Sequence, residues 1–277
     1  MPDYTAPTQD MQFVIDEIAG LDSIAKLPGF EDATPDLVEA VLEQAGVLAN
    51  EVFSPLNQPG DHHGTRIEEG VVVSPPGYAE AYQQFVENGW QGIGKSAAID
   101  GQGLPFLVHS AVAEMWYSSN MAFALCPLLT SGAIEAIEMH APAELQQLYL
   151  PRMISGEWSG TMNLTEPQAG TDLAAIKTRA ERDGDRYRIR GQKIYITWGE
   201  HEMSDNIVHL VLARLPDAPA GVKGISLFLV PKYLANADGS RGERNDLKVV
   251  SVESKMGIHS SPTCVMSYGD NDGAIGY

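Results

Sequence analysis

Two short segments of this 277-residue chain carry the residue types that can hold a flat cofactor ring with polar edges. The first, Met162–Asp172, reads MNLTEPQAGTD and combines hydroxyl groups, a proline turn and a glycine. The second, Lys193–Gly199, reads KIYITWG and ends a run typical of a strand. Backbone N–H groups and hydroxyls can bind the edge of such a ring and stabilise negative charge that develops there. We therefore expect the two segments to meet at a redox cofactor, with a flavin as the best fit.

In the first segment, the turn Thr165–Pro167 suits the edge of the flavin ring. Its proline makes the turn rigid, and the N–H groups of Leu164 and Thr165, with the Thr165 hydroxyl, can face the ring. The pair Gly170-Thr171 suits the pyrophosphate, because a glycine lets the backbone come close. Glu166 belongs to the turn, and we expect it to serve structure.

In the second segment, Tyr195 and Thr197 lie two residues apart and share one face of a strand. That face offers an aromatic wall and a hydroxyl near the flavin N5 atom. Either segment alone has an ordinary explanation, since Thr-Glu-Pro is a common turn and Tyr and Thr are common in strands. Both in this order, with a hairpin between them and a helical block before them, are much more specific.

The chain changes character near Gly156. Residues 1–155 show helical spacing of apolar residues, as in the stretch from Val38 to Val52 that follows the capping sequence Thr34-Pro35. Residues 156–277 alternate as strands do, and Asp183-Gly184 predicts a hairpin turn. Further strands are expected at 207–212, 224–230, 247–252 and 263–268, with a surface loop at 236–245. The sequence thus predicts an α+β fold, with an all-α helical bundle (1–155) before a β-barrel-like or β-sandwich middle domain (156–277).

Composition limits the class of function. The chain has a net charge of −19, of which residues 1–155 carry −17, so nucleic acid is an improbable partner. No apolar run reaches the roughly 20 residues of a membrane span, and the first residues lack the pattern of a signal peptide. We therefore expect a cytoplasmic protein without a membrane partner. Cys126 and Cys264 have no CxxC spacing and are expected to be buried thiols.

No metal site is expected. His62-His63 is interpreted as a loop pair without a third ligand in register, and the remaining histidines are scattered. The chain also lacks a GxGxxG after a strand and a GxSxG elbow, so neither a Rossmann dinucleotide site nor a hydrolase nucleophile is predicted.

Several stretches resemble the acyl-CoA dehydrogenase family. Residues 150–157 (LPRMISGE) resemble its bridge into the β-domain, residues 191–197 (GQKIYIT) its second flavin segment, and residues 255–258 (KMGI) a late strand. The opening, with Tyr4, Ala6-Pro7 and Asp10-Met11, resembles the branch that includes 3-methylmercaptopropionyl-CoA dehydrogenases. The likeness covers essentially the whole chain.

The resemblance implies FAD as the cofactor and an acyl-CoA as the substrate. Carried over by position, the FAD contacts are Met162, Leu164, Thr165, Gly170, Thr171, Tyr195, Ile196 and Thr197. The substrate contacts are Thr171, Gly103 and Leu104, the last two within an acyl pocket around 101–105. The sequence departs from the family pattern where Tyr195 replaces a tryptophan, Gln168 a glycine and His259 an arginine.

The implied reaction removes the α-proton and the β-hydride of an acyl thioester and gives a trans-2-enoyl-CoA. The resemblance further implies an electron-transfer flavoprotein as acceptor, a homo-oligomer, and a C-terminal four-helix domain with a glutamate base. None of that domain follows Tyr277, so no catalytic residue is assigned here and the isolated chain is expected to be poorly active or inactive. A partial dehydrogenase, a non-catalytic partner subunit, and an acyl-CoA oxidase or flavin monooxygenase of the same superfamily remain as alternatives.

Overall fold

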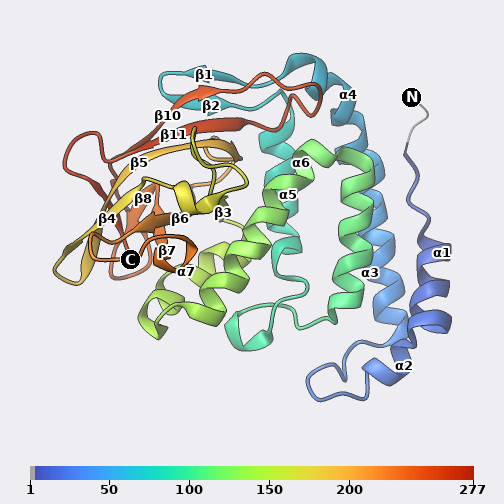
Figure 1. Ribbon diagram of the computed structural model, residues 1–277. Coiled ribbons are helices and arrows are strands. Elements are labelled where there is room, and N and C mark those ends of the chain that lie inside the picture. The colour runs from blue at the N-terminus through green and yellow to red at the C-terminus, as the bar shows by residue number, and fades with distance from the viewer. Residues whose placement is uncertain (1–3) are drawn as a thin grey trace.

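The computed structural model describes residues 4–277 and has a helical block packed against a curled sheet (Figure 1). The helices come first along the chain and lie on one side of the molecule. Their bounds are α1 Thr8–Phe13, α2 Leu21–Ile24, α3 Pro35–Leu48, α4 Ser54–His63, α5 Tyr78–Glu87, α6 Phe106–His140 and α7 Ala143–Ser155. π-helical turns extend α1 over Val14–Ala19 and α3 over Ala49–Phe53, and 3-10 turns lie at Trp90–Gly92 and Ala97–Ile99.

The predicted helix after Thr34-Pro35 is α3, and its capping chemistry is as expected. The Thr34 hydroxyl accepts a hydrogen bond from the Leu37 N–H at 3.3 Å, and Pro35 occupies the first turn. The apolar face of α3 is buried in a core that it shares with α5 and the first part of α6. The resulting bundle confirms the helical first half of the predicted fold.

The long helix α6 bends back on itself at Asn120, whose φ of −156° and ψ of 84° are not helical. The Asn120 side chain holds the bend, because its amide donates to Phe53 O at 3.2 Å and its oxygen accepts from the Phe123 N–H at 3.1 Å. By length and composition, α6 is apolar enough to span a membrane. Just over half of its most apolar window, 56%, is buried inside the protein against the other helices and the sheet.

The second half of the chain forms the sheet. Its strands are β3 Trp158–Asn163, β4 Arg179–Asp183, β5 Arg186–Thr197, β6 Asn206–Arg214, β7 Ile225–Pro231, β10 Leu247–Val252, β11 Thr263–Tyr268 and β12 Ala274–Gly276. They run in the order β10-β11-β5-β4-β6-β3, while β7 also pairs with β6 and β12 with β5. The predicted hairpin joins β4 and β5, and Gly184 has the positive φ of 65° that its tight turn requires.

Two small hairpins were not predicted. β1 Arg66–Glu68 and β2 Val71–Val73 pair within the expected all-α region, and Val72 packs into the core of the sheet. β8 Tyr233–Ala235 pairs with β9 Arg241–Arg244, so part of the expected loop 236–245 is a strand. The pair His62-His63 also ends helix α4, which corrects its interpretation as a loop.

The helical block and the sheet share one hydrophobic core where they meet. β3 runs along the second half of α6, and a joint core contains Ala133 and Ile134 of α6, Met153 of α7, Trp158 of β3 and Val208 of β6. Gly160 allows this close approach, because a Cβ atom there would lie 2.5 Å from the Ala133 Cβ. The helical block and the sheet are therefore fastened together at β3, directly before the first predicted cofactor segment.

Candidate functional site

The turn after β3 lies against strand β5, so the two predicted segments meet. The Ile194 N–H donates to the Thr165 carbonyl oxygen at 2.9 Å, which fixes the turn beside the second segment. Thr197 follows three residues later on the same strand, roughly 10 Å along it. Its carbonyl accepts from the Thr161 hydroxyl of β3 at 2.7 Å. Thr165 and Thr197 therefore both lie where β3 and the turn after it meet the end of β5, and their role at a cofactor stays a prediction.

A bulge shapes the end of β5. Lys193 pairs with Met266 of β11 and Ile196 with Cys264, so two residues of β5 oppose one of β11. Tyr195 lies in the bulge with a φ of 58°, and its side chain is 57% exposed. Lys193 and Ile196 are buried, whereas Tyr195 is exposed and Thr197 is half-buried. The aromatic ring and the hydroxyl are therefore both accessible from outside the core.

Several hydrogen-bonding groups of this surface have no partner within residues 4–277. The hydroxyls of Thr165 and Thr197 make no hydrogen bond there, and neither does the N–H of Thr165. Each of these residues is only half-buried. Since no group of the described chain bonds to them, they are available to the polar edge of a bound ring. This donor set fits the N1, O2 and N5 edges of a flavin.

The remaining residues that were predicted to contact FAD differ in their exposure. Gly170 and Thr171 are exposed, and a Cβ atom at Gly170 would meet nothing within 4 Å. The fold itself therefore does not require glycine at 170, in keeping with an external group that approaches the backbone. Met162 is half-buried, and Ile196 is buried with 2% exposure, so the Ile196 side chain belongs to the core of the sheet.

Behind the turn lies a buried ion pair. The Lys193 ammonium donates to Glu166 Oε1 and to the Leu164 carbonyl oxygen, each at 2.9 Å. Burial alone would raise the pKa of Glu166, but hydrogen bonds from Thr178, Lys177 and Lys193 hold it below its usual value. Glu166 is thus ionised, and its carboxylate is engaged by these donors. The sequence showed both residues, but only the fold shows that they pair.

The predicted acyl contacts Gly103 and Leu104 lie elsewhere in the helical block. Leu104 is buried in the helical core, and the Gly103 N–H donates to Lys95 O at 2.8 Å. Their segment is joined to the second half of α6, because the Lys95 ammonium donates to Ser131 O at 3.3 Å and pairs with Glu135 at 2.8 Å. The structure does not bring them to the turn, and their role stays a prediction.

Another apolar surface lies closer to the turn. The Trp198 indole N–H donates to Ala122 O at 3.0 Å, which joins the end of β5 to α6 just after its bend. On this part of α6, Met121 and Leu128 are each 43% exposed, and Leu125 between them is half-buried. Their spacing of three and four residues puts them on one helix face. The same spacing is visible in the sequence and could have identified this strip.

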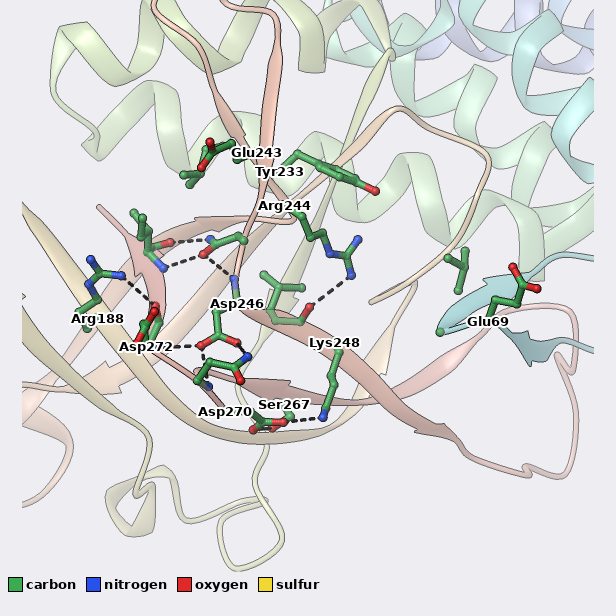
Figure 2. Close-up of a pocket in the computed structure, with 18 residues that line it drawn as sticks. Glu69, Arg188, Tyr233, Glu243, Arg244, Asp246, Lys248, Ser267, Asp270 and Asp272 are labelled. Carbon is green, nitrogen blue, oxygen red and sulfur yellow. Dashed lines mark hydrogen bonds and ion pairs between the residues drawn. The ribbon is translucent and has the colours of Figure 1, made fainter.

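A hollow of about 840 Å³ opens on another part of the sheet, between β2, β8–β10 and the loop before β12 (Figure 2). It contains none of the predicted site residues. Its charged groups largely hold the fold together: Asp246 accepts from the N–H groups of Asn271 and Gly273, and Lys248 pairs with Asp270 at 2.7 Å. Within residues 4–277, no group of three or more metal-binding side chains gathers anywhere.

Comparisons with known proteins agree with this arrangement. Residues 61–157 match the model of the acyl-CoA dehydrogenase N-terminal domain, and residues 161–270 that of the acyl-CoA dehydrogenase middle domain. The chain is 47% identical to 3-methylmercaptopropionyl-CoA dehydrogenase of Ruegeria pomeroyi over 99% of its own length and 46% of that protein. It is 34% identical to a butyryl-CoA dehydrogenase of Syntrophomonas wolfei, with the same two coverages.

Solved structures share this fold as well. An acyl-CoA dehydrogenase from Bacillus anthracis, complexed with FAD, superposes with a TM-score of 0.66 at 21% identity, over 88% of this chain and 37% of that one. The chain spans about half the length of the curated relatives it matches. These matches confirm the predicted family resemblance and the α+β fold class.

Proposed function

The chain belongs to the acyl-CoA dehydrogenase family, and we propose that it forms the flavin-holding half of an enzyme that dehydrogenates an acyl-CoA thioester to a trans-2-enoyl-CoA. The observation that carries the proposal is the meeting of the two segments through the Ile194 N–H and the Thr165 carbonyl. It supports a flavin surface formed by the Thr165 N–H, the two threonine hydroxyls and the exposed ring of Tyr195.

FAD is the proposed cofactor, and when bound it would supply the acceptor of the hydride from the substrate β-carbon. The chain's own part is orientation and electrostatics. The Thr165 N–H and hydroxyl bind the polar edge of the ring, the Thr197 hydroxyl binds near N5, and Tyr195 covers one face. The exposed backbone at Gly170-Thr171 binds the pyrophosphate.

The proton-abstracting base is proposed to lie outside this chain. The carboxylate in the turn, Glu166, is 3% exposed and accepts from Lys193, so it cannot reach a substrate proton. The apolar strip of Met121, Leu125 and Leu128 supports an acyl chain as the substrate, because it borders the end of β5 through the Trp198–Ala122 hydrogen bond.

The wider setting of the proposal rests on the family. We propose an electron-transfer flavoprotein as the electron acceptor, a homo-oligomer for the longer protein, and a cytoplasmic location. Support for the location comes from two cysteines that are free and buried. Burial raises the pKa of Cys264 to about 12, so this thiol is unreactive at neutral pH.

Flavin binding by the purified chain tests the proposal. We expect saturable FAD binding with a visible flavin absorbance band. The variants Thr165→Val and Thr197→Val should each weaken binding about fivefold, because each removes one hydrogen bond worth about 1 kcal/mol. Thr65→Val, at a half-buried threonine after α4, is the matched control and should bind FAD as the wild type does.

The measurement is isothermal titration with FAD, accompanied by circular dichroism to show that each variant is folded. The proposal fails if the folded chain takes up no FAD. The assignment of the two threonines fails if their valine variants bind FAD as tightly as Thr65→Val does.

A further inference from the structure

The buried ion pair beneath the turn is linked to the proposed flavin surface through one peptide bond. Lys193 has no exposed side-chain surface, and its ammonium makes two contacts of 2.9 Å, to Glu166 Oε1 and to the Leu164 carbonyl oxygen. The carbonyl of a trans peptide and the following N–H point in opposite directions. The Leu164 carbonyl is directed inward to Lys193, so the Thr165 N–H of the same peptide unit is directed outward.

Charge strengthens this orientation. A cation at the carbonyl end of a peptide polarises the unit and makes its N–H a better donor to negative charge on the other side. The contact lies in a dry interior, where such an interaction is weakly screened. The outward N–H of Thr165 has no partner in the described chain, so its polarised end is open to the bound ring.

We propose that Lys193 is a positioning residue that aims and polarises the Thr165 N–H toward the flavin, and so raises the reduction potential of the cofactor. The inference rests on the proposed flavin site and assigns a role to a side chain that never touches the ring. The electrostatic consequence is directional: a stronger donor at the ring edge favours the reduced form, which carries more negative charge there.

Glu166 is the second residue of this arrangement. It compensates the buried ammonium, and without it the Lys193 charge would be strongly destabilising. The Glu166 carboxylate also accepts from the backbone N–H groups of Lys177 at 2.6 Å and Thr178 at 3.1 Å, and from the Gln168 amide at 2.6 Å. Lys193 therefore ties the turn to β5, and Glu166 ties it to the residues directly before β4.

The same half of the chain offers a matched control. Lys232 pairs with Glu200, and these side chains are 7% and 0% exposed. The Lys232 ammonium also donates to the His201 carbonyl at 3.3 Å, so its chemistry is that of Lys193. Among the described residues, Lys232 makes no hydrogen bond to the turn or to the second cofactor segment, although Glu200 directly follows that segment and also pairs with Arg244 at 3.5 Å. Loss of this pair should lower stability without a change at the Thr165 N–H.

The experiment compares two double variants, Lys193→Met/Glu166→Gln and Lys232→Met/Glu200→Gln. Each replaces a buried ion pair by uncharged side chains of similar length, a change that folded proteins often accept. In the flavin-free chain, amide hydrogen exchange reports on the turn through the Ile194 N–H, which donates to Thr165, and the Glu166 N–H, which donates to Ala169. FAD affinity and the midpoint potential are measured on the loaded protein.

We expect the Lys193 double variant to exchange faster at Ile194 and Glu166, to bind FAD about tenfold more weakly, and to have a lower potential. A tenfold change in the oxidised-to-reduced ratio corresponds to about 30 mV for a two-electron couple. The Lys232 double variant should keep wild-type values in all three measurements. A single variant, Lys193→Arg, retains the charge and should keep most of the potential.

Two outcomes would overturn the inference. The first is a folded Lys193 double variant with unchanged potential and unchanged exchange at Ile194. The second is an equal fall in potential in the Lys232 control, since that would reflect general loosening of the sheet. Failure of the proposed function has a different signature, because wild-type chain would then bind no FAD while the exchange at Ile194 would still respond to Lys193.

Discussion

At the scale of single residues, two aromatic side chains of the site share an unusual backbone and differ in burial. Tyr195 has a φ of 58° and Trp198 a φ of 52°. A side chain in this left-handed region costs about 1–2 kcal/mol, and strain of this kind collects at functional sites. Trp198 is 1% exposed and packs into the helical core, which accounts for its strain. Tyr195 has no such packing, and its positive φ belongs to the bulge that leaves its ring exposed.

The pair of variants Tyr195→Gly and Trp198→Gly separates these explanations. Glycine accepts a positive φ, and Tyr195 loses little packing, so Tyr195→Gly should raise the free energy of unfolding by up to about 1 kcal/mol and weaken FAD binding. Trp198→Gly should lower the free energy of unfolding by about 3–5 kcal/mol, because removal of the indole leaves a cavity. Urea unfolding of the flavin-free chain measures both, and a destabilised Tyr195→Gly would contradict the explanation by strain.

The sequence could predict some of these residue positions and not others. The two-residue spacing of Tyr195 and Thr197 predicted a shared face, and the structure leaves Tyr195 exposed and Thr197 half-buried. The bulge at 194–195 was not predictable, because it depends on the register with β11, which only the folded sheet defines. Lys193 looked like an ordinary strand lysine for the same reason: its partner Glu166 is 27 residues away in the chain.

At the scale of elements, the loop between β10 and β11 is fastened to helix α4 by His259. The His259 ring contacts Asp61 Oδ1 at 3.1 Å and the Lys255 carbonyl at 2.7 Å, and its backbone N–H also donates to Asp61 at 2.9 Å. The Lys255 carbonyl and then the Asp61 carboxylate raise the pKa of His259 above its usual value. The hollow around this contact is also lined by the ionisable side chains of His62, His63, Glu253 and Lys255.

This contact should weaken as pH rises. A histidine whose pKa is raised by folding contributes stability that is fully present below its unfolded pKa, near 6.5, and is lost as pH rises through the folded value. We expect amide exchange at Ser261, whose N–H donates to Ile258, to increase between pH 6 and pH 8.5 beyond the intrinsic chemical dependence. His259→Gln should abolish this excess, whereas the exposed His140→Gln should leave it. An unchanged excess in His259→Gln would rule the mechanism out.

Long, strongly patterned elements were predictable, and short paired ones were not. The spacing of apolar residues identified α3, and Asp183-Gly184 correctly located the β4–β5 hairpin. β1 and β2 have three residues each, too few for a periodic signal. β9 reads Arg-Gly-Glu-Arg, a polar sequence that forms a strand because β8 offers it a partner.

At the scale of the whole molecule, the change of pattern near Gly156 coincides with the end of α7 at Ser155 and the start of β3 at Trp158. The sequence did not reveal that the two layers share a core. Residues of α6 and α7 pack with Trp158 of β3 and Val208 of β6, and Trp198 of the sheet half is buried among the helices. Such contacts join residues far apart in sequence, so no local pattern reports them. We infer that the two halves unfold together.

A matched pair of glycine variants tests that inference. In Gly160→Ala the new Cβ would lie 2.5 Å from the Ala133 Cβ and 2.9 Å from the Met153 Cε, so the layers must separate. Overpacking of this kind costs about 1–3 kcal/mol. Gly132→Ala adds the same atom on the exposed side of α6, where nothing lies within 4 Å, and should stabilise the chain by about 0.5–1 kcal/mol.

Each variant is unfolded in urea and followed by helical circular dichroism and by amide exchange at Val211 in the middle of β6. If the shared core couples the layers, both probes give one midpoint. Gly160→Ala lowers that midpoint and Gly132→Ala raises it. Within each variant, the shift is the same for the helices and for the sheet. A Gly160→Ala protein in which the helices unfold at the wild-type urea concentration while β6 exchanges earlier would show two independent units. The flavin surface would then sit on a sheet that the helical block does not support, and the strip at Met121 could not be held at a fixed distance from Thr197.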